Sequence, residues 1–96
     1  MTTDMFAAST ELKKRYLERK FKEFDSYDPT QVDLPWAQQM GHQIKGNAAT
    51  FDFPALEPLG AQLEIAAKNN EVEVVLRLLS AIKLECLRYQ SEIDKS

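Results

Sequence analysis

The stretch "LPWAQQMGHQIKGNAATF", residues 34–51, carries the clearest helical pattern in the sequence and holds the only histidine of the chain. Its apolar residues recur every three or four positions, as they do on one face of a helix. On a wheel turning about 100° per residue, five of them fall roughly 160° to 240° from His42. These five are Ala37, Met40, Ile44, Ala48 and Phe51. The stretch therefore predicts a helix with this stripe buried and His42 on the opposite, exposed side.

Both ends of this stretch carry boundary signals. Asp33 or Leu34 can cap the start, and Pro35 suits the first turn, where a missing amide hydrogen costs little. The tripeptide "DFP", residues 52–54, marks the next break, because its proline disfavours helical dihedrals at the preceding residue and its aspartate can cap a following helix. We expect this helix to run to about Phe51.

Apolar residues recur at helical spacing in two of the other segments. The first is "STELKKRYLERKFKEF", residues 9–24, where Ser9 or Thr10 can cap the start. The second is "PALEPLGAQLEIAAKNN", residues 54–70, whose asparagines suit a helix end. Pro58 lies near the beginning of this second segment and predicts a kink or a later start.

The last segment, "EVEVVLRLLSAIKLECLRYQSEI" at residues 71–93, has a long apolar stripe that includes Cys86. Four amphipathic helices joined by short breaks bury their stripes together in a bundle. The sequence therefore predicts an all-α fold, an antiparallel up-down four-helix bundle that forms a single domain over residues 1–96. The chain begins with Met and ends without a linker, so a free-standing protein is plausible, and a domain cut from a longer protein stays open.

Composition and charge disfavour several classes of protein. The formal net charge is −3, so no general positive field draws the chain to nucleic acid or anionic lipid. No apolar run approaches the roughly 18 residues that a membrane span needs, and the N-terminus lacks the features of a signal peptide. Cys86 has no intramolecular partner and falls on an apolar stripe, which indicates a buried structural thiol in a reducing compartment. We expect a cytoplasmic protein with no membrane association.

The first predicted helix has a basic face interleaved with glutamates. Its cations are Lys13, Lys14, Arg15, Arg19, Lys20 and Lys22, and its acids are Glu11, Glu18 and Glu23. Ion pairing on a solvated face explains this pattern, and a nucleic-acid surface is the alternative. The overall negative charge disfavours that alternative.

Small, polar and cationic residues surround His42 on its own face: Gln38, Gln39, Lys45, Gly46 and Ala49. A glycine such as Gly46 lowers the stability of a helix interior by about 1 kcal/mol relative to Ala. On an exposed face, packing within the bundle gives no reason for this glycine. Lys45 would favour an anion attached to the imidazole ring. These features suit a histidine that is phosphorylated by a docking partner, while an incidental surface histidine remains open.

The sequence lacks the residues that a metal site or a hydrolytic active site would need. A zinc site requires three or four ligands, and there is no second histidine, no thiol at suitable spacing and no acid on the His42 face. No Asp or Glu lies one turn away to orient the imidazole, and no glycine-rich loop could hold a nucleotide. We expect no metal site and no cofactor.

The segment "HQIKGNAATFDFPALEPLGAQLE", residues 42–64, resembles the motif of the histidine-containing phosphotransfer (HPt) domain family. That motif runs approximately H-x-L-K-G-x-A, then a turn, a leucine and a final L-E on the next helix. The matching residues are His42, Ile44, Lys45, Gly46, Ala48, Leu56, Leu59, Leu63 and Glu64. The chain departs from the family at Asp52, where a glycine is usual in the turn.

The resemblance implies a phosphoryl carrier rather than an enzyme. His42 would accept a phosphoryl group from the aspartyl phosphate of a response-regulator receiver domain, or of a hybrid sensor kinase, and pass it to another receiver. Lys45 would be the charge partner, and Gly46 would give the receiver room. Gln38 or Gln39 could donate hydrogen bonds to phosphoryl oxygens, and the receiver would supply Mg²⁺. The alternative is a non-catalytic helical adaptor that binds a protein partner through the same face; the oligomeric state is open.

Overall fold

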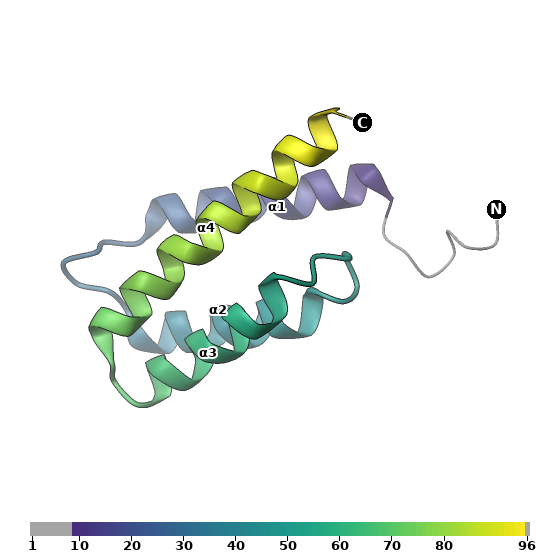
Figure 1. Ribbon diagram of the computed structural model, residues 1–96. Helices are drawn as coiled ribbons and strands as arrows, with labels where there is room; N and C mark the ends of the chain where they lie inside the picture. The colour runs from purple at the N-terminus through teal and green to yellow at the C-terminus, as the bar shows by residue number, and fades with distance from the viewer. Residues whose placement is uncertain (1–8, 96) are drawn as a thin grey trace.

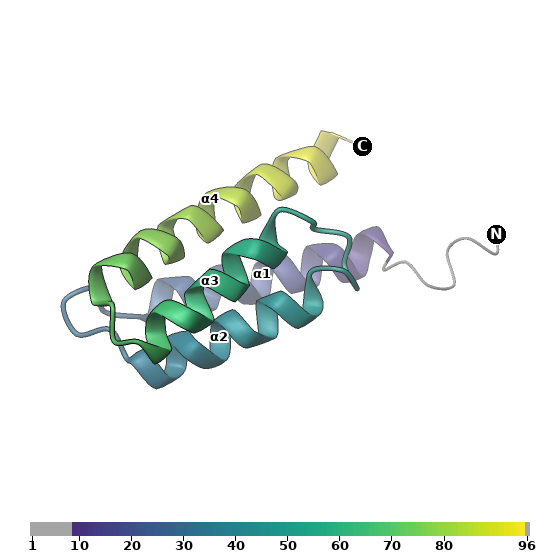
Figure 2. The same cartoon turned by 60° about the horizontal axis from the view of Figure 1, so that its bottom comes forward.

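The computed structural model describes residues 9–95, which form four α-helices and no strand (Figure 1). The helices are α1 Thr10–Ser26, α2 Leu34–Asn47, α3 Leu56–Lys68 and α4 Val72–Lys95. Consecutive helices run in opposite directions, and α3 packs against both α2 and α4 while α4 packs against α1 (Figures 1 and 2). This arrangement confirms the predicted all-α, up-down four-helix bundle. None of the helices within residues 9–95 is long and apolar enough to cross a membrane.

All four helices contribute to one core. Its largest fully buried side chains are Phe53, Leu17, Met40, Ile44, Leu56, Leu63, Leu79, Ile82, Val75 and Cys86. The predicted stripe of α2 is buried over Ala37, Met40, Ile44 and Ala48, while Phe51 is half-buried and stacks on Tyr16 with ring centroids 4.4 Å apart. The periodicity of α2 therefore identified its core face.

Side chains cap the first two helices as the sequence predicts. The Ser9 hydroxyl accepts a hydrogen bond from the Leu12 amide at 3.2 Å, and the Asp33 carboxylate accepts one from the Trp36 amide at 3.1 Å. Each bond satisfies one of the four amide hydrogens that a helix start leaves without a partner. Pro35 lies in the first turn of α2.

The end of α2 differs from the prediction. The helix ends at Asn47 rather than near Phe51, because the chain then tightens into turns that close at Asp52. Asp52 has a φ of 58°, and the next amide, of Phe53, donates to the Ala48 carbonyl at 2.8 Å. Asp52 thus adopts the left-handed conformation for which glycine is usual, at the energetic cost that a side chain brings there.

The prediction that Asp52 can cap α3 is wrong. The cap position belongs to Ala55, whose methyl group cannot accept a hydrogen bond, and the Asp52 carboxylate instead lies 3.8 Å from the Lys13 ammonium. The later start resolves the difficulty of Pro58, which becomes the third residue of α3. An amide hydrogen at that position would have no partner within the helix. Asn70, with a φ of 60°, closes the other end of α3.

The prediction that Lys20 belongs to a solvated basic face is wrong. Lys20 is only 3% exposed, and its ammonium lies 3.3 Å from Glu23, 3.6 Å from the Met40 sulfur and 5.3 Å from the centre of the Tyr16 ring. The reason is its register, because Lys20 follows the buried Leu17 by three residues and so shares its face of α1. Leu12 and Val72, near the starts of α1 and α4, are apolar but 50% and 42% exposed.

Replacing Lys20 with methionine should raise the free energy of unfolding by about 1 kcal/mol, because a buried ammonium is costly to remove from water and methionine fills a similar volume. Urea unfolding measures the change. Lys22→Met, on an exposed position of the same helix, is the control and should shift stability by less than about 0.5 kcal/mol. A less stable Lys20→Met protein would show instead that the Lys20–Glu23 pair stabilises the fold.

Candidate functional site

The histidine extends from α2 into solvent. The His42 side chain is 68% exposed, and the apolar stripe on the opposite side of the helix is buried. The exposure predicted by the helical wheel is confirmed. A partner protein can therefore reach the imidazole ring without any opening of the bundle.

A carboxylate from the neighbouring helix holds this ring. Oε2 of Glu64 on α3 lies 3.0 Å from Nδ1 of His42, and Oε1 of the same carboxylate lies 3.0 Å from Nζ of Lys45. Lys45, and to a smaller extent His42, keep the pKa of Glu64 below its ordinary value, although partial burial acts in the opposite direction. Glu64 is therefore ionised at neutral pH and can only accept hydrogen bonds.

The prediction that no acid lies on the His42 face is wrong. It holds for α2 itself, but α3 brings Glu64 beside the ring from 22 positions further along the chain. A spacing of one helical turn relates only residues of the same helix. The signal for Glu64 in the sequence is the final L-E of the motif.

The bond to Glu64 determines which nitrogen of the neutral imidazole is free. An ionised carboxylate accepts but does not donate, so Nδ1 must carry the hydrogen when the ring is neutral. Nε2 then retains its lone pair. Because Glu64 occupies the Nδ1 side and His42 is largely exposed, Nε2 is the nitrogen available to an incoming electrophile.

The remaining residues predicted around His42 lie on the same surface. Gln38 and Gln39 line a shallow hollow with His42, Glu64 and Pro35, of about 370 Å³. Gln38 is half-buried and Gln39 is exposed. This places two amide side chains beside the ring.

Gly46 and Ala49 are both exposed on α2 and the turn that follows it. A methyl group added at Gly46 would meet no atom of the described residues within 4 Å, apart from its own helix backbone and chain neighbours. Packing inside the bundle therefore does not explain this glycine, in agreement with the expectation from sequence. The surface one turn beyond His42 is low and open.

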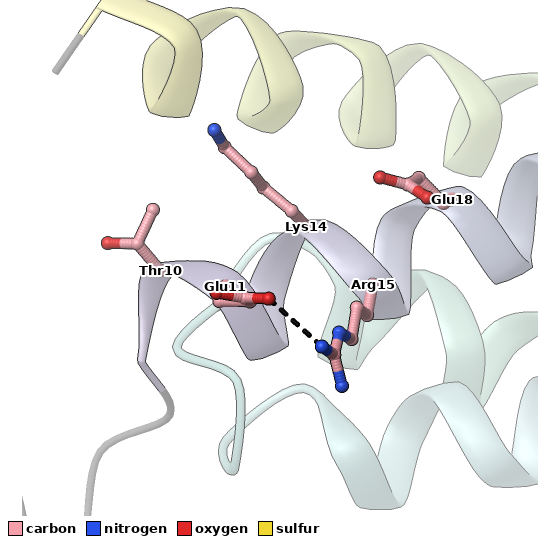
Figure 3. A pocket seen from close by; sticks show the side chains of 5 residues that line it. All are labelled: Thr10, Glu11, Lys14, Arg15 and Glu18. Atoms are coloured by element: carbon pink, nitrogen blue, oxygen red, sulfur yellow. Dashed lines mark hydrogen bonds and ion pairs between the residues drawn. The ribbon is translucent and has the colours of Figure 1, made fainter.

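A larger hollow, of about 470 Å³, lies beside the first turns of α1 and is lined by Thr10, Glu11, Lys14, Arg15 and Glu18. Figure 3 shows that all five side chains come from α1, and that Glu11 pairs with Arg15, at 2.9 Å. This is a solvated face with an ion pair one turn apart, as predicted for part of the basic face. Within residues 9–95, no group of three or more His, Cys, Asp or Glu side chains could hold a metal ion.

Fold and site together define a helical bundle that presents one solvent-facing histidine, oriented by a carboxylate. The family model of the Hpt domain matches residues 4–92, and the chain therefore belongs to the Hpt domain family. Domains of this family serve histidine phosphotransfer in phosphorelays, as phosphoryl carriers rather than true enzymes. No curated protein and no solved structure matches the chain.

Proposed function

We propose that this protein is a phosphorelay intermediate in which His42 accepts a phosphoryl group from the aspartyl phosphate of one receiver domain and passes it to the aspartate of another. The observation that carries the proposal is the 3.0 Å contact between Nδ1 of His42 and the Glu64 carboxylate, on a ring that is 68% exposed. In the neutral ring this contact places the hydrogen on Nδ1 and leaves the Nε2 lone pair open to a docked partner.

The transfer needs no base from this chain. The Nε2 lone pair attacks phosphorus, the N–P bond forms, and the P–O bond to the receiver aspartate breaks, so that the aspartate leaves as a carboxylate with the bonding electron pair. The ring becomes a cation that keeps its hydrogen on Nδ1. Glu64 offsets that positive charge, and the reverse sequence delivers the phosphoryl group to the next receiver.

The receiver would supply Mg²⁺ and its acidic pocket, since this chain is expected to hold no cofactor. Gln38 and Gln39 would donate hydrogen bonds to phosphoryl oxygens from the hollow beside the ring. A cytoplasmic location belongs to the proposal and is supported by the unpaired, buried Cys86. The partners would be receiver domains, free-standing or attached to a hybrid sensor kinase.

The proposal is tested by mixing the protein with a phosphorylated receiver domain and Mg²⁺ and following the phosphoryl group. The expected product is a label on this protein that acid removes and base does not, as for a phosphorus–nitrogen bond on histidine. The adaptor alternative predicts that the same receiver binds without leaving any label. Binding titrations run with and without a phosphoryl donor therefore separate the two functions.

Lys45→Ala should slow transfer by about 10-fold to 100-fold without unfolding the bundle, because the transition state loses a nearby cation. The Lys45 side chain is 43% exposed, and its ammonium lies 3.0 Å from the Glu64 carboxylate. The phosphoryl group on His42 can therefore replace Glu64 as the ion-pair partner of Lys45. Rapid-quench labelling measures the rate. Lys14→Ala, on α1, is the matched control, and equal rates for both variants would contradict the role of Lys45.

Gly46→Leu should weaken receiver binding by about 10-fold or more, because a large side chain would enter the open surface one turn from His42. The same change should stabilise α2 slightly, since leucine is the better helix former. Titration by fluorescence or calorimetry measures affinity, with Gly46→Ala as the smaller step on the same site. If Gly46→Leu binds receivers as tightly as the parent, Gly46 does not mark the docking surface.

A further inference from the structure

Two glycines let α2 and α3 touch through their backbones. A methyl group added at Gly41 would lie 2.6 Å from the Glu64 amide nitrogen and 2.7 Å from the Gly60 carbonyl oxygen. One added at Gly60 would lie 2.7 Å from the Lys45 amide nitrogen and 2.9 Å from the Gly41 carbonyl oxygen. Real side chains do not approach backbone atoms so closely, so neither position accepts alanine unless the helices separate.

This close approach occurs at the site itself. Gly41 precedes His42 directly and lies one turn before Lys45, and Gly60 lies one turn before Glu64. Figure 2 shows α2 and α3 side by side. The backbones that carry the three interacting side chains are therefore held at contact distance by the absence of two methyl groups.

The distance between the helices controls the hydrogen bond to the imidazole. In an alanine variant at either glycine, the helices would have to separate by about 0.8 Å to give the new methyl group an ordinary contact, judged from the 2.6 Å approach. The Nδ1–Oε2 distance of 3.0 Å would then exceed the range of a good hydrogen bond unless the Glu64 side chain compensated.

We propose that Gly41 and Gly60 are positioning residues, which set the spacing of α2 and α3 so that Glu64 reaches Nδ1 of His42 and, in the neutral ring, leaves the lone pair on Nε2. Their importance for phosphoryl acceptance rests on the proposed function. Their control of the imidazole tautomer does not, and it can be measured with no phosphoryl donor or receiver present.

The test is ¹⁵N nuclear magnetic resonance of the protein labelled in histidine, which gives the signals of one imidazole because the chain has one histidine. The neutral parent ring should favour hydrogen on Nδ1. Gly41→Ala and Gly60→Ala should lower the ratio of the Nδ1–H to the Nε2–H form by about threefold to tenfold, the effect of losing a charge-assisted hydrogen bond. Every sample contains trimethylamine N-oxide, which favours the folded state. Circular dichroism verifies that each variant is folded.

Two controls separate positioning from general loss of stability. Gly46→Ala is the same chemical change on α2 but meets open space, and Ile82→Val weakens the core on α4; both should keep the parent ratio. In a Glu64→Ala background, which has the lowered ratio already, Gly60→Ala should cause no further change. The inference is overturned if the folded Gly41→Ala and Gly60→Ala proteins keep the parent ratio, or if Gly60→Ala acts equally strongly without Glu64.

Discussion

Replacing His42 with glutamine should abolish labelling by a phosphorylated receiver, with a loss of at least about 1000-fold, because an amide nitrogen has no basic lone pair with which to attack phosphorus. The bundle should remain folded, since the His42 side chain is 68% exposed and lies opposite the buried stripe of α2. We expect the free energy of unfolding to change by less than about 0.5 kcal/mol.

Labelling and urea unfolding on the same preparation make this result decisive. Gln43→Ala, a change at the neighbouring exposed position of α2, should leave labelling as it is in the parent. If His42→Gln still acquires the label, another residue accepts the phosphoryl group and the proposed function is wrong. Loss of the label together with loss of helical structure would call for a smaller change, and His42→Asn provides it.

Raising the pH from 9 to 11 should destabilise the bundle by about 4 kcal/mol, because two buried acids must stay protonated in the fold. Burial raises the pKa of the Cys86 thiol from 9.0 to about 12. Burial, with a smaller effect of Cys86, also raises the pKa of the Tyr16 hydroxyl from 10.0 to about 12. The unfolded chain releases both protons at lower pH, so rising pH favours unfolding; this stability is complete below pH 9 and is lost toward pH 12.

Urea unfolding at a series of pH values measures this loss. Between pH 9 and 10 the thiol should dominate, since its ordinary pKa is the lower of the two. Cys86→Ala should be less stable at neutral pH because it leaves a cavity, but its stability should vary less over this interval. An equal slope for Cys86→Ala and the parent would show that the buried thiol does not cause the alkaline loss.

Helical periodicity was sufficient to predict the exposure of His42, because it compares residues of a single helix. Ala37 and Ile44 are buried in the structure and His42 is not, whatever the neighbouring helices are. Local chemistry likewise narrowed each of the first two caps to a pair of adjacent residues, of which Ser9 and Asp33 make the bond, since a cap involves only residues three positions apart. Residue type is misleading at Lys20, a charged residue whose register on α1 places it beside Leu17 and buries it.

Four amphipathic helices, the buried stripe of α2 and a histidine that faces water could all be predicted from local sequence patterns. The contact of Glu64 with this histidine, and the backbone contact of α2 and α3 at Gly41 and Gly60, depend on how the helices pack against each other. The physical reason is that periodicity fixes the direction of each side chain about its own helix axis. Which groups of two helices meet depends on how closely the axes approach and how the helices are rotated against each other, and those quantities are set by the packing of the whole core.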